Sequence, residues 1–267
     1  MKKEKKKLTQ RLTLRIILTL FVIAAAVISF LRADYYSVFL CALTLLLFVI
    51  PAFVDRRLKI QLPTVLEATI LLFIFAAEIL GEIGSFYTQI RWWDTMLHTI
   101  NGFIMAAIGF SLIDILNNSS RFHIHMSPLF VTLVGFCFSM TVGVVWEFFE
   151  YSADLFMRTD MQKDFIINSI SSVALNPSGL NDPIKITGIT DTVIHYVQNG
   201  QSMEYTVPGG FLDIGINDTM KDLLVNCIGA VVFSIYGYLY LIGRGKVNIL
   251  KMFIPRKKHF TYEEEQR

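Results

Sequence analysis

Long apolar stretches alternate with short polar ones along most of this chain. Several windows approach the ~20 apolar residues that a helix needs to cross the hydrocarbon core of a bilayer. These windows cover residues 12–31, 35–54, 64–86, 95–116, 128–152 and 219–242. The pattern therefore predicts an all-α membrane protein, built as a bundle of about six transmembrane helices.

The connection between the fifth and sixth helices is different, because it is long, polar and rich in β-prone residues. It covers residues 153–217, and Asn-Gly at 199–200 stands between the β-prone runs 190–197 and 203–207. Asn-Gly between such runs indicates a two-residue hairpin turn. We expect a small extracytoplasmic β-hairpin insert, with a third strand near 184–189. Such a loop can serve as a lid or binding element, or it can be a plain insertion.

Basic residues indicate the direction of the helices, because cytoplasmic loops carry an excess of Lys and Arg. The loops 55–63 and 117–127 are basic, like the two ends of the chain. Placing these segments in the cytoplasm makes helices one, three and five run outward and the others inward. The expected layout is a basic cytoplasmic N-terminus at 1–11, five helices within 12–152, the outer insert at 153–217, a sixth helix at 218–242 and a charged cytoplasmic tail at 243–267.

Composition supports the membrane and argues against nucleic acid as a partner. Hydrophobic residues make up 54% of the chain and charged residues 17%, whereas soluble domains carry roughly 25% charged residues. The net charge is only +2. The basic runs flank apolar segments and carry no nucleic-acid-binding motif, so the expected partner is the lipid bilayer.

Ionisable side chains inside spanning helices are costly, so each of them needs a partner or a function. Residues three or four apart share a helix face, and the polar residues of the last four helices follow that spacing. They are Glu78 and Glu82 on helix three, Asp94, His98 and Asn101 on helix four, Glu147, Glu150, Tyr151 and Asp154 on helix five, and Asp218, Asp222 and Asn226 on helix six. In the expected topology every set falls in the outer half, which predicts one acidic pocket open to the outside.

Carboxylates that crowd together in a dry site cannot all remain charged. A divalent metal ion could neutralise them, and its candidate ligands are Asp94, His98, Glu147 and Asp222. Protonated members of the group could serve as general acids, so the same four residues are the catalytic candidates. The third reading is a structural network with basic partners such as Lys221.

These readings leave three functions open. The first is a metal-assisted or acid/base site that acts on a polar or lipid-linked envelope substrate. The second is a secondary transporter or ion pathway, which needs polar residues in the inner half, where the chain offers little beyond Glu67, Asp114 and Thr132. The third is a structural or accessory protein whose polar network orders the bundle.

Three motifs carry a family resemblance. They are Asp94-x-x-x-His98 at a helix start, Glu147-x-x-Glu150 at a helix end and Asp218-x-x-x-Asp222 at a helix start. In this order they resemble the YjdF-type bacterial membrane proteins over residues 64–242. A more distant similarity to VanZ-like membrane proteins rests on the glutamate of helix five and on Asp222, Asn226 and Gly229. The resemblance implies a bacterial plasma membrane and supports the pocket residues, but it brings no reaction with it.

Overall fold

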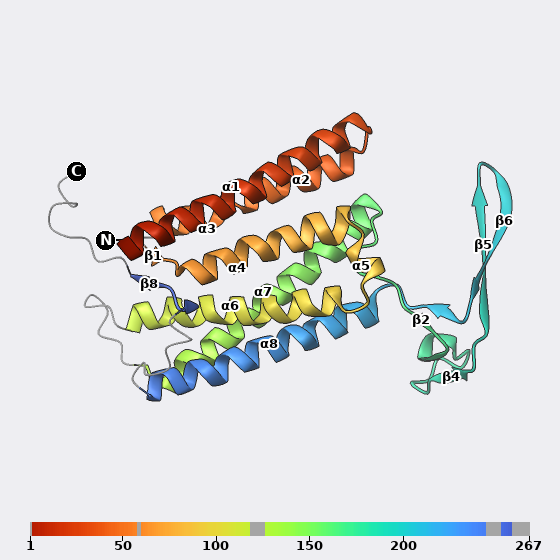
Figure 1. The fold of residues 1–267 in the computed structure, drawn as a ribbon. Helices are drawn as coiled ribbons and strands as arrows, with labels where there is room; N and C mark the ends of the chain where they lie inside the picture. Colours follow the sequence, from red (N-terminus) through yellow and green to blue (C-terminus); the bar gives the residue numbers. More distant parts are fainter. Residues whose placement is uncertain (1, 58–59, 118–125, 244–251, 258–267) are drawn as a thin grey trace. The chain divides into compact units, whose positions relative to one another are not determined.

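The computed structural model describes residues 2–57, 60–117, 126–243 and 252–257. In these residues six helical stretches are long and apolar enough to cross a membrane, and they are Thr9–Leu31, Tyr35–Val54, Thr64–Ile83, Trp93–Asn117, Pro128–Met157 and Ile216–Ile242. The expected all-α bundle of about six spans is confirmed (Figure 1). Most of the loop 117–127 and of the tail 243–267, which we used to orient the chain, lies outside the described residues.

The chain divides into two compact units. The first comprises Met1–Val144 and Asp222–Arg267, and it contains most of the helical bundle. The second comprises Val145–Lys221 and contains the strands of the insert. Two helices, α7 (Pro128–Met157) and α8 (Ile216–Ile242), continue from one unit into the other.

The second predicted span is interrupted near its C-terminal end. It consists of α2 (Tyr35–Leu47) and α3 (Ile50–Arg57), and it follows the long helix α1 (Lys2–Leu31). Pro51 accounts for the break, because proline has no N–H to bond to the carbonyl of Leu47 and its ring crowds the preceding turn. The sequence windows predicted one continuous helix here, which the proline divides.

The third span changes its helix type midway. The α-helix α4 (Thr64–Phe75) continues as the π-helix η1 (Ala76–Ile83), which carries Glu78 and Glu82. Gly84 N–H donates to the carbonyl of Ile79 at 2.8 Å, a bond to the fifth residue back. Ser85 then adopts a left-handed conformation with φ 60°, and a short helix α5 (Phe86–Gln89) follows. π-Helical segments are rare and often occur at functional sites.

Helices α6 (Trp93–Asn117) and α8 run parallel and very close together. Gly102 of α6 lies against the backbone carbonyl of Asn226, and Gly229 of α8 lies against that of Thr99. A Cβ atom at either glycine would overlap with the carbonyl oxygen facing it. Small residues permit such close approach in membranes. The parallel direction agrees with the expected topology, in which helices four and six both run inward.

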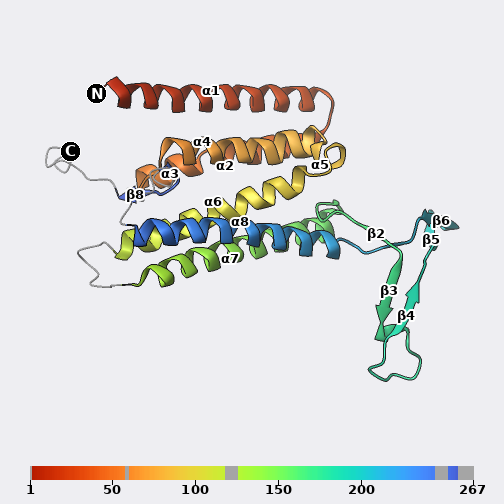
Figure 2. The same cartoon turned by 60° about the horizontal axis from the view of Figure 1, so that its bottom comes forward.

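Two large apolar clusters, and a smaller one around Leu66 of α4 and Ile104 of α6, hold the first unit together. One joins α6, α7 and α8, with Phe110 and Phe233 at its centre, their rings 5.6 Å apart. The other joins α1, α2, α4 and η1 around Val22 and Leu71. A short strand β1 (Ile60–Gln61) also pairs with β8 (Arg256–Lys257). Figures 1 and 2 show the helices running alongside one another in both views.

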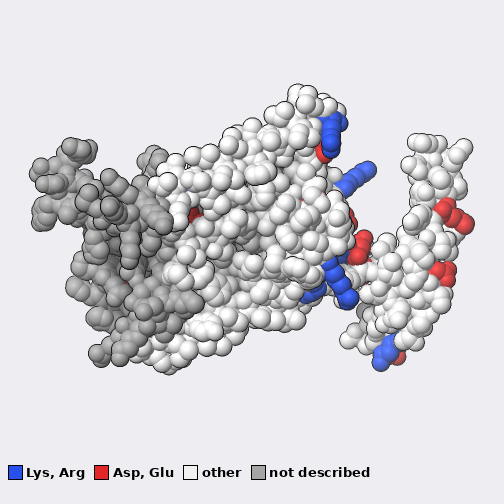
Figure 3. Space-filling view, viewed as in Figure 1, with Lys and Arg blue, Asp and Glu red and all other residues white. Residues whose placement is uncertain are grey.

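The outward side chains of the helices suit a lipid environment. Large apolar side chains such as Leu20, Phe130 and Leu224 are exposed on them. Figure 3 shows one side of the helices, on which the described surface is almost free of charged side chains. Because exposed apolar surface of this extent needs a nonaqueous surrounding, the protein is a multi-pass membrane protein.

The second unit contains three separate pairs of antiparallel strands among its described residues. They are β2 (Ile166–Ile167) with β7 (Phe211–Leu212), β3 (Ser169–Ser172) with β4 (Ile184–Thr187), and β5 (Asp191–Gln198) with β6 (Gln201–Pro208). A 3-10 turn, η2 (Val173–Leu175), follows β3. The pair β3–β4 is seen in Figure 2.

The hairpin β5–β6 is the one predicted from the sequence. Asn199 and Gly200 form its two-residue turn with φ angles of 52° and 77°, as a type I′ turn requires. The expected strand near 184–189 exists as β4, but it pairs with β3 and does not extend the hairpin. The sequence pattern indicated the strand, whereas its partner depends on the path of the whole insert.

Candidate metal centre

Two carboxylates and one imidazole meet near the beginnings of α6 and α8. Asp94 is the second residue of α6, His98 follows one turn later, and Asp222 is the seventh residue of α8. One ligand atom from each side chain lies within 4.8 Å of the other two. Because the two helices run parallel, Asp222 lies beside the first turns of α6, where the positive end of the helix dipole favours a carboxylate such as that of Asp94.

The imidazole of His98 lies close to both carboxylates. Its Nε2 is 3.4 Å from Oδ1 of Asp94 and 3.7 Å from Oδ2 of Asp222. The side chain of Asp222 is 2% exposed, that of His98 12% and that of Asp94 21%, so the group is largely shielded and Asp94 is its most exposed member. The same atoms could bind a divalent ion, or a protonated imidazole could bridge the two carboxylates.

A hydrogen-bonded asparagine pair lies one helical turn further along both helices. Asn101 Nδ2 donates to Oδ1 of Asn226 at 3.0 Å, and Asn226 is almost fully buried. Asn226 Nδ2 also donates to the backbone carbonyl of Ser139 on α7, at 3.5 Å. The hydroxyl of Ser139 in turn donates to the carbonyl of Gly102 at 2.9 Å. This hydrogen-bond network fixes the spacing of α6 and α8 one helical turn after the candidate ligands His98 and Asp222.

The two acids of the third span belong to the same unit but lie on the π-helix η1. Glu78 is 7% exposed and Glu82 is half-buried. In the described part of the chain, the group of metal-ligating side chains that meets within 4.8 Å consists of Asp94, His98 and Asp222. Glu78 and Glu82 are therefore not among its members, and their place in the expected pocket stays a prediction.

The candidate acids of helix five belong to the second unit. Glu147 is buried, and its Oε2 accepts a hydrogen bond from Nε2 of Gln162 at 3.3 Å. The same amide nitrogen donates to Oγ1 of Thr219 at 2.6 Å, which connects the loop after α7 to the first turns of α8. Gln162 was not recognised from the sequence, because it lies in the insert, outside any apolar window.

Two other members of that helix have different surroundings. Glu150 is buried and accepts a hydrogen bond from Nε1 of Trp146 at 2.7 Å, one turn earlier on α7. Tyr151 is 58% exposed, so its ring does not lie in the interior of its unit. The expectation that both contribute to the pocket stays a prediction.

Asp154 and Asp218 bind the backbone of the loop between them. Asp154 accepts hydrogen bonds from Thr159 Oγ1 at 2.8 Å, from the N–H of Met161 at 2.6 Å and from that of Gln162 at 2.9 Å. Asp218 accepts the N–H of Lys163 at 2.9 Å. Its other oxygen lies 3.1 Å from Nζ of Lys221, the basic partner expected from the sequence.

Asp213 was missed by the sequence reasoning, although an acidic residue just before a helix is a typical capping signal. It accepts the N–H of Phe165 at 2.7 Å, of Asn217 at 2.9 Å and of Gly215 at 3.2 Å, and it also accepts the side-chain amide of Asn217. Burial alone would raise the pKa of Asp213, but these hydrogen bonds outweigh it and lower the pKa below the ordinary 3.8.

Comparison with known proteins places the whole helical region in one family. The model of the family described as predicted membrane protein (DUF2238) matches residues 13–243. The chain belongs to this family. An uncharacterised protein of Thermotoga maritima is 28% identical over 81 residues, which cover 30% of this chain and 40% of that protein. No solved structure matches the sequence.

The polar residues at the opposite end of this DUF2238 protein have local partners. Arg11 Nη1 of α1 lies 3.1 Å from Oε2 of Glu67, and its Nε donates to Oγ1 of Thr64 at 2.9 Å. The hydroxyl of Thr132 donates to the carbonyl of Pro128 at 3.0 Å. Glu67 and Thr132 thus have partners close to them. These contacts give no support to a pathway of polar residues for ions or substrates along the bundle.

Proposed function

We propose that Asp94, His98 and Asp222 bind a divalent metal ion, and that this ion acts on a polar or lipid-linked substrate of the cell envelope. The observation that carries the proposal is the convergence of one imidazole nitrogen and two carboxylate oxygens within 4.8 Å. These side chains come from two helices, and Asp94 and Asp222 are 128 residues apart in the sequence. Intramembrane ionisable groups that converge in this way are functional by default.

The donor set favours an ion that accepts both nitrogen and oxygen ligands. Zn²⁺ and Mn²⁺ meet this condition, whereas Ca²⁺ and Mg²⁺ prefer oxygen alone. Three protein ligands leave positions open for water or substrate, as in catalytic rather than structural metal sites. When bound, the ion would polarise an oxygen of the substrate. His98 and the two aspartates would orient the ion, and the shielded position of Asp222 would limit access of water from that side.

The proposed substrate class follows from the predicted orientation. With both termini in the cytoplasm, the N-terminal ends of α6 and α8 lie at the outer face of a bacterial plasma membrane. A site at this depth can reach headgroups and polar groups carried by lipids. The YjdF-type and VanZ-like resemblances stay predictions, and the proposal does not depend on them.

Glu147 remains a predicted fourth ligand. It belongs to the second unit, where it is buried and accepts a hydrogen bond from Gln162. A variant tests its role without changing the size of the side chain. If Glu147 is a ligand, Glu147→Gln lowers the affinity for the ion at least tenfold, as removal of a charged ligand does, while Gln162→Ala changes it far less.

Metal content is the first test of the proposal. The full chain is purified in detergent through a tag without histidine, loaded with Mn²⁺ or Zn²⁺, desalted, and its metal is measured by mass spectrometry. The expected result is one ion per chain in the wild type and none in His98→Gln or Asp222→Asn. His195→Gln is the matched control, because it removes an imidazole that is not among the three proposed ligands and should leave one ion bound.

A structural role of the triad predicts the opposite pattern. Breaking a buried ion pair costs roughly 3–5 kcal/mol of stability. In that case Asp222→Asn would lower the melting temperature strongly, and no variant would change the metal content. A wild type without stoichiometric metal at saturating concentrations would exclude the metal site.

A further inference from the structure

The hairpin β5–β6 presents two long strand edges, and that of β5 carries little of the usual protection. Its eight cross-strand pairs, from Asp191 with Pro208 to Gln198 with Gln201, are continuous and contain no bulge. In the described residues neither strand has a further neighbour in its sheet. Proteins normally blunt such edges with Lys, Pro or bulges, and residues 191–207 contain no Lys, Arg or Pro. An isolated two-stranded hairpin is also only marginally stable in water.

The hydrogen-bonding pattern shows which backbone groups of β5 point outward. The N–H of Gly209 donates to the carbonyl of Thr190 at 2.8 Å, and Gln198 faces Gln201 across the two-residue turn. Alternate residues of an antiparallel pair bond to the partner strand, so the even-numbered residues of β5 bond to β6. The N–H and C=O groups of Asp191, Val193 and His195 therefore point away from β6.

We propose that this edge of β5 pairs antiparallel with β5 of a second copy of the chain, with Val193 opposite Val193 of the partner subunit. In this register Asp191 lies opposite the partner's His195, and by symmetry His195 lies opposite the partner's Asp191. An imidazole N–H directly across a strand pair from a carboxylate can donate a hydrogen bond to it, and such cross-strand contacts stabilise the pair. The proposal is independent of the metal site, because it concerns only the hairpin.

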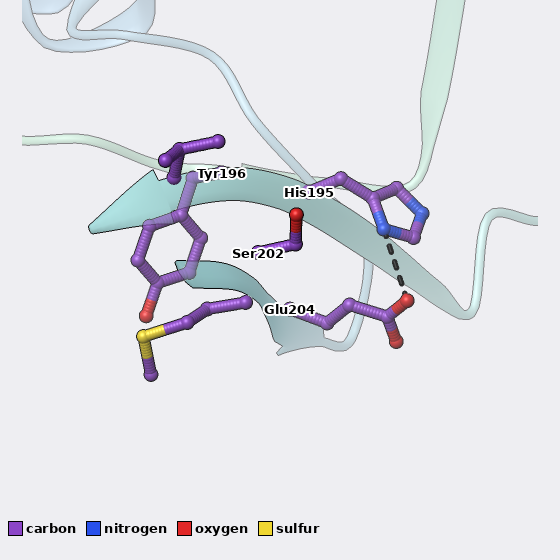
Figure 4. A pocket seen from close by; sticks show the side chains of 6 residues that line it. His195, Tyr196, Ser202 and Glu204 are labelled. Atoms are coloured by element: carbon purple, nitrogen blue, oxygen red, sulfur yellow. Dashed lines mark ion pairs between the residues drawn. The ribbon is translucent and has the colours of Figure 1, made fainter. Parts of the chain in front are cut away.

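The surroundings of His195 fit this arrangement. Its Nδ1 lies 3.0 Å from Oε1 of Glu204 on β6, and both side chains are exposed. Figure 4 shows that the other ring nitrogen points away from Glu204. An aspartate from a second copy would place a carboxylate on each side of the ring, within reach of both ring nitrogens.

The opposite face of the hairpin also favours a symmetric pair. Ile194, Tyr196, Met203 and Tyr205 all lie on it and are exposed. A pairing through the odd-numbered residues of β5 keeps these side chains on one face of the resulting four-stranded sheet. The apolar strips of the two copies would then be adjacent and shield each other from water.

The free edge of β6 is less suitable for such self-pairing. Its outward-pointing residues are Ser202, Glu204 and Thr206, and the strand ends at Pro208, which has no N–H. A twofold pairing centred on this edge would place Glu204 opposite the same residue of the partner. Like charges directly opposite each other destabilise a strand pair, so β5 is the edge that we assign to the contact.

Disulfide cross-linking in membranes tests the register. Val193→Cys should form a covalent dimer under mild oxidation, because the two Cα atoms would lie about 5.5 Å apart. Thr206→Cys is the matched control, since Thr206 lies directly across from Val193 but on the far strand. In the proposed dimer the two Cα atoms of residue 206 would be separated by about three strand spacings, or about 14 Å. Equal dimer yields from the two variants would overturn the proposal.

Proline variants test the same contact without a cross-link. Val193→Pro removes an outward N–H and leaves the bonds to β6 in place, so it should weaken dimerisation at least tenfold in detergent, as measured by native mass spectrometry. Thr206→Pro makes the same change on the other edge and should leave the dimer intact. A monomeric wild type, or a Val193→Pro variant that dimerises like the wild type, would contradict the proposed pairing.

Discussion

Two groups of acids in this protein have very different surroundings. Asp213 and Asp154 each accept at least three hydrogen bonds, most of them from backbone N–H groups of nearby residues. Asp94 and Asp222 come from different helices, and both lie near Nε2 of one imidazole. The first group shapes a loop and a helix start, and the second brings together ligand atoms from distant parts of the chain.

The difference suggests how structural and functional acids can be separated in a membrane protein. A carboxylate that collects local N–H donors satisfies chain ends that would otherwise be costly to bury. A carboxylate that meets an imidazole and a second carboxylate brings ligand atoms from different helices together. Both kinds look alike in the sequence, as single acids near helix ends. Substitutions in the two groups should therefore affect different properties.

The largest effect that we expect is a loss of stability on replacing Asp213. Asp213→Ala leaves the N–H groups of Phe165, Gly215 and Asn217 without their acceptor, which costs roughly 1–3 kcal/mol for each group that remains buried. Limited proteolysis of residues 158–215 and thermal unfolding should show this loss clearly. Metal binding should remain at one ion per chain. A variant as stable as the wild type would contradict the structural role of Asp213.

A second prediction concerns the helix contact that positions the ligands. Gly229→Ala places a Cβ against the carbonyl of Thr99 and pushes α8 away from α6. Since ligands come from both helices, we expect metal affinity to fall about tenfold, in line with other changes that misplace ligands. Gly135→Ala, in the contact between α7 and α6, is the control, because it should lower stability without this loss of affinity.

A third prediction follows from the pKa of Asp213. Its folded-state pKa lies below the ordinary 3.8, so its contribution to stability is present above pH 4 and is lost as the pH falls through the folded value. Acid should therefore unfold the insert of the wild type progressively below about pH 4. Asp213→Asn should show a smaller dependence in this range. Equal losses of stability with falling pH in the wild type and in Asp213→Asn would contradict the lowered pKa of Asp213.

The smallest expected effect is a gain in stability on replacing Asp164. Burial raises the pKa of Asp164, and the neighbouring charges of Asp160, Asp213 and Asp154 raise it further. The charged form is therefore disfavoured in the folded protein, so Asp164→Asn should slightly increase the melting temperature at neutral pH. The gain should shrink as the pH falls through the folded pKa, where the wild-type carboxyl becomes protonated. A decrease at neutral pH would be inconsistent with this explanation.

The sequence predicted the features that depend on local pattern. Hydropathy indicated the six spans, Asn199-Gly200 indicated the hairpin, and the four-residue spacing of Asp94 and His98 indicated a shared helix face. The approach of Asp222 to this pair followed from the expected direction of the helices. In each case the relevant information lies within one element or in the topology of the bundle.

Other features depend on tertiary contacts and could not be predicted. The π-helix η1 continues directly from α4, and the hydrophobic period does not distinguish it from an α-helix. The partner of β4 and the contacts of Gln162 depend on how the insert folds back. The division into two units likewise reflects contacts between residues far apart in sequence.

The most direct test of the central claim is electron spin-echo spectroscopy of Mn²⁺ bound to the purified protein. The method detects nitrogen nuclei in direct contact with the ion. We predict coupling to one imidazole nitrogen in the wild type, its loss in His98→Gln and its retention in His195→Gln. A bound ion without nitrogen coupling, or coupling that survives in His98→Gln, would contradict a metal site formed by Asp94, His98 and Asp222.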